Sequence, residues 1–282
     1  MRPIELSPER IAELKNQMDA ALEEQNLEKI IELIDQGANP DQQRNSDGVF
    51  PIFLAAQFKK PDLVKKLIEQ GAKVVSPDGI EYSRRDDGLT PLILVAGDGD
   101  LDVAQLLVAK GANINLISSR WKQTPLASAV MQGRIDMVAY LLEQNANVEQ
   151  GSSSETTPLK LTVTPFRNDQ PLETRTKIAA LLLFYGANDE AVLDHPVILA
   201  AKDLLQDAMK SVPIDTNILN ALNFGTHPRV GAESPAKILP LDIRQLIGMY
   251  VKADLEADKK VPSSGAGKAI IKKLTENHHT QS

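Results

Sequence analysis

Histidine is the residue type in this chain best suited to proton transfer or metal binding, and all four histidines lie after residue 190. They are His195, His227, His278 and His279, and no two of them have the i,i+4 spacing of a helical zinc site. His195 and His227 each precede a proline, which favours extended or turn backbone. A catalytic centre within residues 190–282 stays open as an alternative, and it requires a polar pocket around one of these two histidines.

Two short segments have part of the pattern of a ligand-binding loop. Ser263–Ala269 reads SSGAGKA, but a phosphate-binding loop needs a glycine where the chain has Pro262, and Ser or Thr where it has Ala269. Gly97–Asp102 reads GDGDLD, but it lacks the later glycine and the final glutamate of a calcium loop. Cysteine is absent, which excludes thiol catalysis, disulfides and thiolate zinc sites. We therefore predict no catalytic residue, no cofactor and no metal.

Bulky aromatic and cationic side chains gather in two segments, and these residue types suit recognition of another protein. Trp and Arg combine a large contact area with directed hydrogen bonds, so they often anchor interfaces. Because the chain has a formal net charge of −7, a basic and aromatic patch indicates a partner with an acidic surface. Alternatively, Trp121 packs on its own segment and the arginines pair with Asp86 and Asp87. The candidates are Tyr82, Arg84, Arg85, Arg120, Trp121 and Lys122.

The two segments that contain these candidates lie between internal repeats, and the fold of the repeats must hold them in place. Equivalent positions, marked by a glycine or by Asn145, recur after 34, 40, 34 and 41 residues. The base period is close to the roughly 33 residues of a helical repeat unit, and the longer intervals contain insertions. The copies are Asp47–Val75, Asp87–Asn115, Trp121–Glu149 and a looser Glu155–Asp189, preceded by a partial copy that ends at Asp41.

Each copy predicts two short antiparallel helices. Thr90 can cap the first helix, and Pro91 fits its first turn, where no N–H donor is needed. Gly111 ends the second helix, because glycine adopts the left-handed backbone there at little cost. Neither helix can bury its apolar stripe alone, so stacked copies must form a solenoid. The expected core positions of this copy are Leu92, Val95, Ala96, Val103, Leu106 and Leu107.

The TPL-type start, the LL-x-x-GA ending and the period resemble those of the ankyrin-repeat family over residues 18–189. The resemblance implies an all-α solenoid of four to five helix-turn-helix units. It also implies non-catalytic protein recognition through loop tips and the inner face of the first helices. The sequence departs from the family at Phe53, Ile93, Ala127 and Lys160, where a histidine is usual, and at Asn145 in place of glycine. Inner-face candidates by repeat alignment are Phe58, Leu94, Asp98, Met131 and Gln132.

The C-terminal region follows a different pattern. We expect the repeat array with an N-terminal capping helix over residues 1–189, a helical region over 190–258 and a flexible tail over 259–282. Helices are predicted over 197–210 and 213–224. The segment Leu239–Val251 resembles the first helix of F-box proteins, which implies a ubiquitin-ligase adaptor that binds Skp1 as an alternative function. The matching residues are Leu239, Pro240, Asp242, Ile243, Leu246, Ile247 and Tyr250.

One position resembles a modification site. Asn115, eight residues after Leu107, occupies the position at which ankyrin-repeat proteins resemble substrates of an asparaginyl hydroxylase. The alternative is a turn-stabilising asparagine, since this residue type favours turns by itself.

Composition and charge limit the classes of function that remain. Of the 282 residues, 42% are hydrophobic and 24% charged, which is ordinary for a soluble globular chain. Residues 190–282 hold 11 acidic and 11 basic residues, so the first 189 carry the whole negative excess. We expect no nucleic-acid binding, no membrane insertion and no signal peptide. The sequence predicts a cytoplasmic monomer, and its divergent repeats and polar tail resemble those of bacterial ankyrin effectors that act in eukaryotic host cells.

Overall fold

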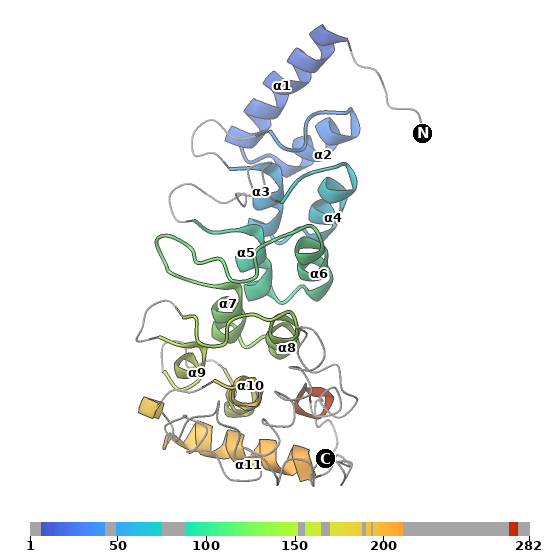
Figure 1. Cartoon of the computed structure of the whole chain (residues 1–282). Helices are drawn as coiled ribbons and strands as arrows, with labels where there is room; N and C mark the ends of the chain where they lie inside the picture. Colours follow the sequence, from blue (N-terminus) through green and yellow to red (C-terminus); the bar gives the residue numbers. More distant parts are fainter. Residues whose placement is uncertain are drawn as a thin grey trace, which may run out of the picture. The chain divides into compact units, whose positions relative to one another are not determined.

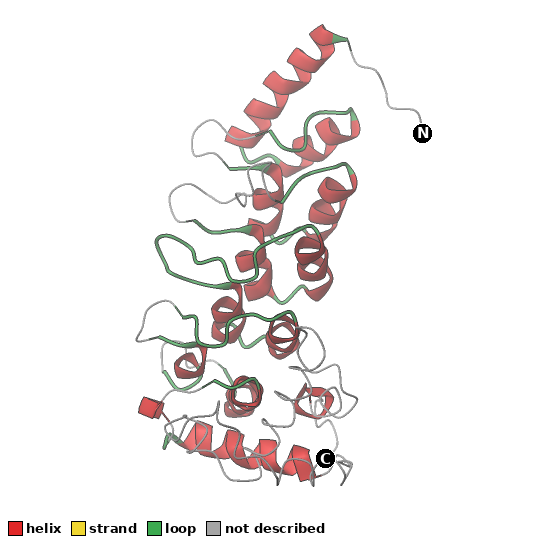
Figure 2. Ribbon diagram, viewed as in Figure 1, coloured by secondary structure: helices red, strands yellow, loops and turns green. Residues whose placement is uncertain are grey.

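The computed structural model describes residues 7–42, 49–74, 88–151, 156–164, 170–187, 190–192, 194–210 and 271–275 (Figure 1). Within these ranges all regular secondary structure is helical and no strand occurs (Figure 2). The chain divides into two compact units, Met1–Ala129 and Val130–Ser282. The boundary between the units falls inside α7 (Pro125–Met131).

Unit 1 is a stack of helix pairs. Helix α1 packs against α2, α3 against α4 and α5 against α6, and the pairs then stack through α2 on α3, α3 on α5 and α4 on α6 (Figure 1). This arrangement confirms the predicted all-α stack of helical hairpins. The helices are α1 (Pro8–Glu23), α2 (Leu27–Asp35), α3 (Pro51–Gln57), α4 (Pro61–Glu69), α5 (Pro91–Asp98) and α6 (Leu101–Ala109).

Unit 2 is organised around one central helix, α10 (Leu172–Phe184), which packs against α8, α9 and α11. Every residue from Lys177 to Phe184 is buried, as expected of a helix that is covered on all sides. Lys177 is the one charged residue in this buried stretch, and its ammonium pairs with the Glu173 carboxylate at 2.9 Å. The other elements are α8 (Ile135–Glu143), α9 (Pro158–Leu161), a 3-10 helix (Glu190–Val192) and α11 (Pro196–Lys210).

A threonine begins the first helix of three pairs. The Thr90 hydroxyl accepts the Ile93 N–H, and Thr124 and Thr157 do the same for the amide three residues later, at 3.1–3.3 Å. A proline follows each threonine, so the missing N–H falls where a helix needs none. The predicted helix start at Thr90 and Pro91 is therefore confirmed. Phe50 stands at the equivalent position before α3 and provides no side-chain cap.

The second helix of each pair ends in a residue with left-handed backbone. The φ of Gly71 is +94°, and Asn145 adopts +65° at the equivalent position. The next residue, always an alanine, then donates its N–H to a leucine carbonyl five residues back, which satisfies an otherwise unpaired acceptor. These bonds are 2.9–3.0 Å long and join Ala38 to Leu33, Ala72 to Leu67, Ala112 to Leu107, Ala146 to Leu141, and Ala187 to Leu182.

Four of the first helices, α1, α3, α5 and α7, are followed by the same left-handed backbone, whereas α9 ends at Thr162 with φ of −71°. Gly99 and Gly133 have φ values of +87° and +68°, but Gln25 and Lys59 adopt +53° and +55° at the corresponding turns. The sequence analysis did not anticipate that these two side chains occupy left-handed positions. Left-handed backbone costs a residue with a Cβ more than it costs glycine, so both turns are held by the packing of the helices they join.

The core of the α5–α6 pair follows the prediction with one correction. Leu92, Val95, Ala96, Val103 and Leu107 are buried, but Leu106 is only half-buried and Ala104 takes its place in the core. The reason is helical geometry. At about 100° per residue, positions 103, 104 and 107 share one face, whereas position 106 lies at the edge of that face.

Ion pairs join neighbouring helix pairs of unit 1, but they contribute little to the stability of the unit. Lys66 of α4 contacts Asp35, the last residue of α2, at 2.7 Å, and Lys59 contacts Asp98 at 2.8 Å. At least one partner of each pair is exposed, and exposed ion pairs contribute at most about 1 kcal/mol. Apolar burial between the helices is therefore the main source of stability in this unit.

The C-terminal region is described only in part. Helix α11 confirms the helix predicted over 197–210. Residues 271–275 form a helical turn with Ile271 and Leu274 buried. The predicted helix over 213–224 lies outside the described residues. The three domain boundaries given in the sequence analysis stay predictions.

The left-handed positions lead to a stability prediction. Gly71→Ala is expected to lower the free energy of unfolding by about 1–2 kcal/mol, because an added Cβ meets nothing within 4 Å and the whole cost is backbone conformation. Urea denaturation followed by circular dichroism measures it. Asn145→Gly is the opposite change at an equivalent position and should not destabilise. An equal loss in both variants would contradict this account.

Candidate functional site

The most distinctive surface feature of unit 1 is a projecting loop between α6 and α7, residues 113–123, which we call the finger. Its base is fixed by Asn113, whose side-chain oxygen accepts the Asn115 N–H at 2.9 Å. Higher up, the Ser118 N–H donates to the Gln123 carbonyl, and the Gln123 N–H donates to the Ser118 hydroxyl, each at 2.9 Å. Ser118 is fully buried. Residues 119–122 are therefore held as a closed turn.

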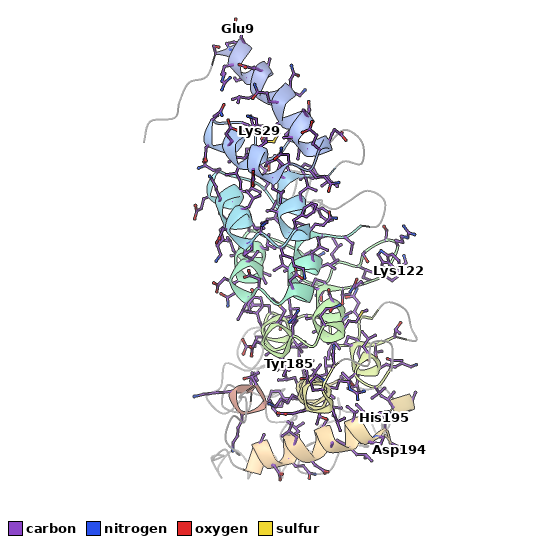
Figure 3. All side chains as sticks on the ribbon, turned by 180° about the vertical axis from the view of Figure 1, so that it is seen from behind. Glu9, Lys29, Lys122, Tyr185, Asp194 and His195 are labelled. Carbon is purple, nitrogen blue, oxygen red and sulfur yellow. The ribbon has the colours of Figure 1, made fainter. Side chains whose placement is uncertain are left out.

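The tip of the finger presents Arg120, Trp121 and Lys122, and all three are exposed. The Trp121 side chain is 56% exposed, which makes it one of the most exposed large apolar residues described. The Arg120 guanidinium carbon lies 5.1 Å from the centroid of the Trp121 ring, within the range of a cation–π interaction. Lys122, which is labelled in Figure 3, has left-handed backbone. Its φ is +51°. The structure thus brings together three of the residues predicted to bind a partner.

A second segment of unit 1, which contains Gly88, packs closely against the finger. Gly88 has φ of +67°, and a Cβ added there would lie 2.6 Å from the Ser119 backbone nitrogen. Only glycine allows this approach, because the contact is to backbone rather than to a movable side chain. The position of the tip therefore depends on a residue that precedes α5.

Ile117 is a finger residue that the sequence analysis missed. Its side chain is 40% exposed, whereas the neighbouring Ser118 is buried. Hydropathy alone predicts the reverse for an isoleucine beside a serine. The serine is inside because its hydroxyl accepts the Gln123 N–H and its own N–H donates to the Gln123 carbonyl. Ile117 adds apolar surface to the finger.

The inner-face candidates of unit 1 differ in exposure. Phe58, at the end of α3, is 42% exposed and is available to a partner. Leu94 is half-buried, and Asp98 is held by its ion pair with Lys59. Of these three, Phe58 is the one whose geometry fits a partner contact.

The remaining inner-face candidates belong to unit 2. Met131 and Gln132 follow the boundary between the units and are both exposed. The Met131 carbonyl accepts the Gln170 side-chain N–H at 2.6 Å, which ties the end of α7 to the segment before α10. Tyr82, Arg84 and Arg85 lie outside the described residues.

Comparison with known proteins gives the family. The sequence model described as ankyrin repeats (3 copies) matches residues 17–118, 76–152 and 96–192 of this chain. This chain belongs to the ankyrin-repeat family. Ankyrin repeats are protein-interaction modules that bind through the surface formed by their stacked units. The predicted fold class and the general role in protein recognition are thereby confirmed.

Several curated proteins share part of the array. The chain is 26% identical over 166 residues to "Neurogenic locus notch homolog protein 1" of Xenopus tropicalis, covering 49% of this chain and 6% of that protein. It is 36% identical over 97 residues to "Ankyrin repeat and SAM domain-containing protein 6" of Rattus norvegicus (34% and 10%). A putative ankyrin repeat protein of Rickettsia felis is 34% identical over 105 residues (37% and 46%). The chain thus spans less than half of each of these relatives.

Two hollows of the ankyrin array lie where the helices of a pair turn. One, of 350 Å³, is lined mainly by aliphatic side chains of α3–α6 together with Lys59 and Asp98. The other, of 690 Å³, lies beside the α1–α2 and α3–α4 turns. No histidine lines either of these two hollows. Their lining provides no paired base and nucleophile.

His195, one of the two histidines considered for catalysis, has a structural role at the start of α11 (Figure 3). Its Nδ1 accepts the Val197 N–H at 3.2 Å, and its carbonyl accepts the Ile198 and Leu199 N–H groups. These are the bonds of a helix-capping residue. His227, His278 and His279 lie outside the described residues.

The described residues also bear on metal binding and on membrane insertion. Among them, no group of three or more His, Asp or Glu side chains is placed to hold a metal ion. No described helix is long and apolar enough to cross a membrane. Each finding holds for that part of the chain alone.

Two predictions on the C-terminal helix and on Asn115 stay open. The adaptor residues Leu239–Tyr250 lie outside the described residues, so Skp1 binding stays a prediction. Asn115 is half-buried at the base of the finger, with its N–H bonded to Asn113. That bond supports the turn-stabilising interpretation, and hydroxylation of Asn115 stays a prediction.

The contact between Gly88 and the finger can be tested. Gly88→Ala should displace the tip, lower the free energy of unfolding by about 1–3 kcal/mol and make Trp121 more accessible to acrylamide. Trp121 is the single tryptophan of the chain, so its fluorescence reports the finger alone. Gly71→Ala is the matched control, since it changes a left-handed glycine in open space. Identical quenching in both variants would show that Gly88 does not support the tip.

Proposed function

We propose that this ankyrin array is a non-catalytic recognition module whose finger binds an acidic surface of a partner protein. Trp121 serves as the apolar anchor, and Arg120 and Lys122 provide the complementary charge. The observation that carries the proposal is the exposed pair of Arg120 and Trp121 at the tip of a hydrogen-bonded finger. Large, rigid aromatic and guanidinium groups in such positions frequently dominate binding energy.

The finger supports this role because its backbone is ordered before any partner arrives. The paired bonds between Ser118 and Gln123, and the close approach of Gly88 to Ser119, fix the turn that displays the three side chains. Association then orders little additional backbone, and less free energy is lost than in a loop that folds on binding.

Charge supports an acidic partner. The finger carries two cations, Arg120 and Lys122, on either side of Trp121 in a chain whose net charge is −7. Among the described residues neither cation forms an ion pair, so both are available to an approaching carboxylate. Local positive charge of this kind speeds encounter with an acidic surface and selects against basic ones.

The interface extends beyond the finger in this proposal. Phe58 on the inner face of unit 1 is a further apolar contact, because its side chain is exposed. Met131, which belongs to unit 2, is exposed as well and is proposed as a partner contact of that unit by itself. Tyr82, Arg84 and Arg85, which precede Gly88 in the sequence, would add aromatic and positive side chains of the same types as the finger.

Substitutions at the tip test the proposed function. Arg120→Ala together with Trp121→Ala should weaken partner capture from a eukaryotic lysate, read by mass spectrometry, by at least about tenfold. The thermal midpoint should stay unchanged, because both side chains are exposed. Lys110→Ala is the control, since it removes an exposed cation of unit 1 outside the finger. Capture that is equally strong with all three proteins would overturn the proposal.

A further inference from the structure

We infer that the finger recognises a single carboxylate side chain, Asp or Glu, that has an apolar residue beside it in the partner. The carboxylate binds the guanidinium of Arg120, and the apolar neighbour packs against Trp121 and Ile117. This inference rests on the proposed function and narrows its acidic surface to a two-residue motif.

The placement of Arg120 favours a carboxylate. Its guanidinium lies over the Trp121 ring, with 5.1 Å between the guanidinium carbon and the ring centroid. The ring covers one side of the guanidinium, and among the described residues Arg120 forms no ion pair that would occupy its N–H groups. Those N–H groups form a planar fork that matches the two oxygens of a carboxylate. A lysine at the same position would offer a point charge without this geometry.

The stack also limits the motion of Arg120 before binding. An arginine has many side-chain rotamers, and immobilising them opposes association. Contact with the ring restricts these rotamers in the free protein, so less entropy is lost when a carboxylate arrives. Trp121 therefore acts as a positioning residue for Arg120 as well as a contact surface.

The apolar half of the motif follows from exposure. Seven large hydrophobic side chains are exposed in the described part of the chain, and two of them, Ile117 and Trp121, lie within five residues on the finger. Burying them against a partner is favourable only when the partner offers apolar surface. A stretch of acidic residues alone would contact the cations and leave both side chains in water.

The number of cations at the tip indicates whether the partner group is a carboxylate or a phosphate. The described tip offers one guanidinium and one ammonium, from Arg120 and Lys122. A phosphorylated side chain carries nearly two negative charges and is usually held by a cluster of arginines. A single planar fork beside exposed apolar surface fits the singly charged carboxylate better.

The test begins with selection of displayed random twelve-residue peptides on the full chain. We expect the recovered peptides to contain Asp or Glu next to a large apolar residue. Each is then synthesised without tryptophan and titrated while the emission of Trp121 is recorded. Arg120→Lys should weaken binding about tenfold despite keeping the charge. Asp→Asn or Glu→Gln in the peptide should cause a similar loss with the wild type and little further loss with Arg120→Lys.

The outcomes separate this inference from the proposed function. Peptides that need Trp121 but tolerate both Arg120→Lys and the amide substitution would overturn the inference and leave the proposed function standing. A phosphoserine peptide that binds more than tenfold tighter than its aspartate form would also overturn it. If no recovered peptide prefers the wild type to Trp121→Ala, both fail, because a two-residue motif occurs many times in such a library. Lys110→Ala should bind every peptide normally.

Discussion

The structure depends on apolar burial between neighbouring helix pairs. Apart from α1, the helices of unit 1 are seven to nine residues long, and isolated helices of that length are unstable in water. Each is stabilised because residues such as Leu54, Leu67 and Leu107 are fully buried against the next helices. The capping threonines and left-handed turns set where each helix stops, so the buried faces of successive pairs meet in register. Polar contacts between pairs are secondary to this packing.

The sequence predicts this array well because its signals are local and repeated. A threonine before a proline marks three helix starts, and a glycine before an alanine marks four helix ends, at Gly37, Gly71, Gly111 and Gly186. Prediction was weaker where the signal depends on neighbours. Leu106 has the right chemistry for the core, but Ala104 lies closer to the centre of the buried face. Lys59 gives no sign in the sequence of its left-handed backbone, which the joined helices impose.

At the candidate site, too, the residue types can be read from the sequence, but their arrangement in space cannot. The residue types at positions 120–122 predict a recognition tip, and this role stays a prediction. The closed turn that holds them requires a buried Ser118 and a contact between Gly88 and Ser119, which are far apart in the sequence. No single-sequence pattern reports such a contact. Ile117 was missed for a related reason, since its exposure follows from the hydrogen bond of its neighbour.

The bonds that close the finger come from main-chain atoms and from Ser118, while the Arg120 side chain lies over the Trp121 ring. The bonds that fix the tip are thus separate from the side chains that it displays. Arg120 and Trp121 can therefore be replaced with little penalty for folding. The same separation makes the turn a natural insertion point for grafted peptides, in which the array would serve as a stable carrier of a new specificity.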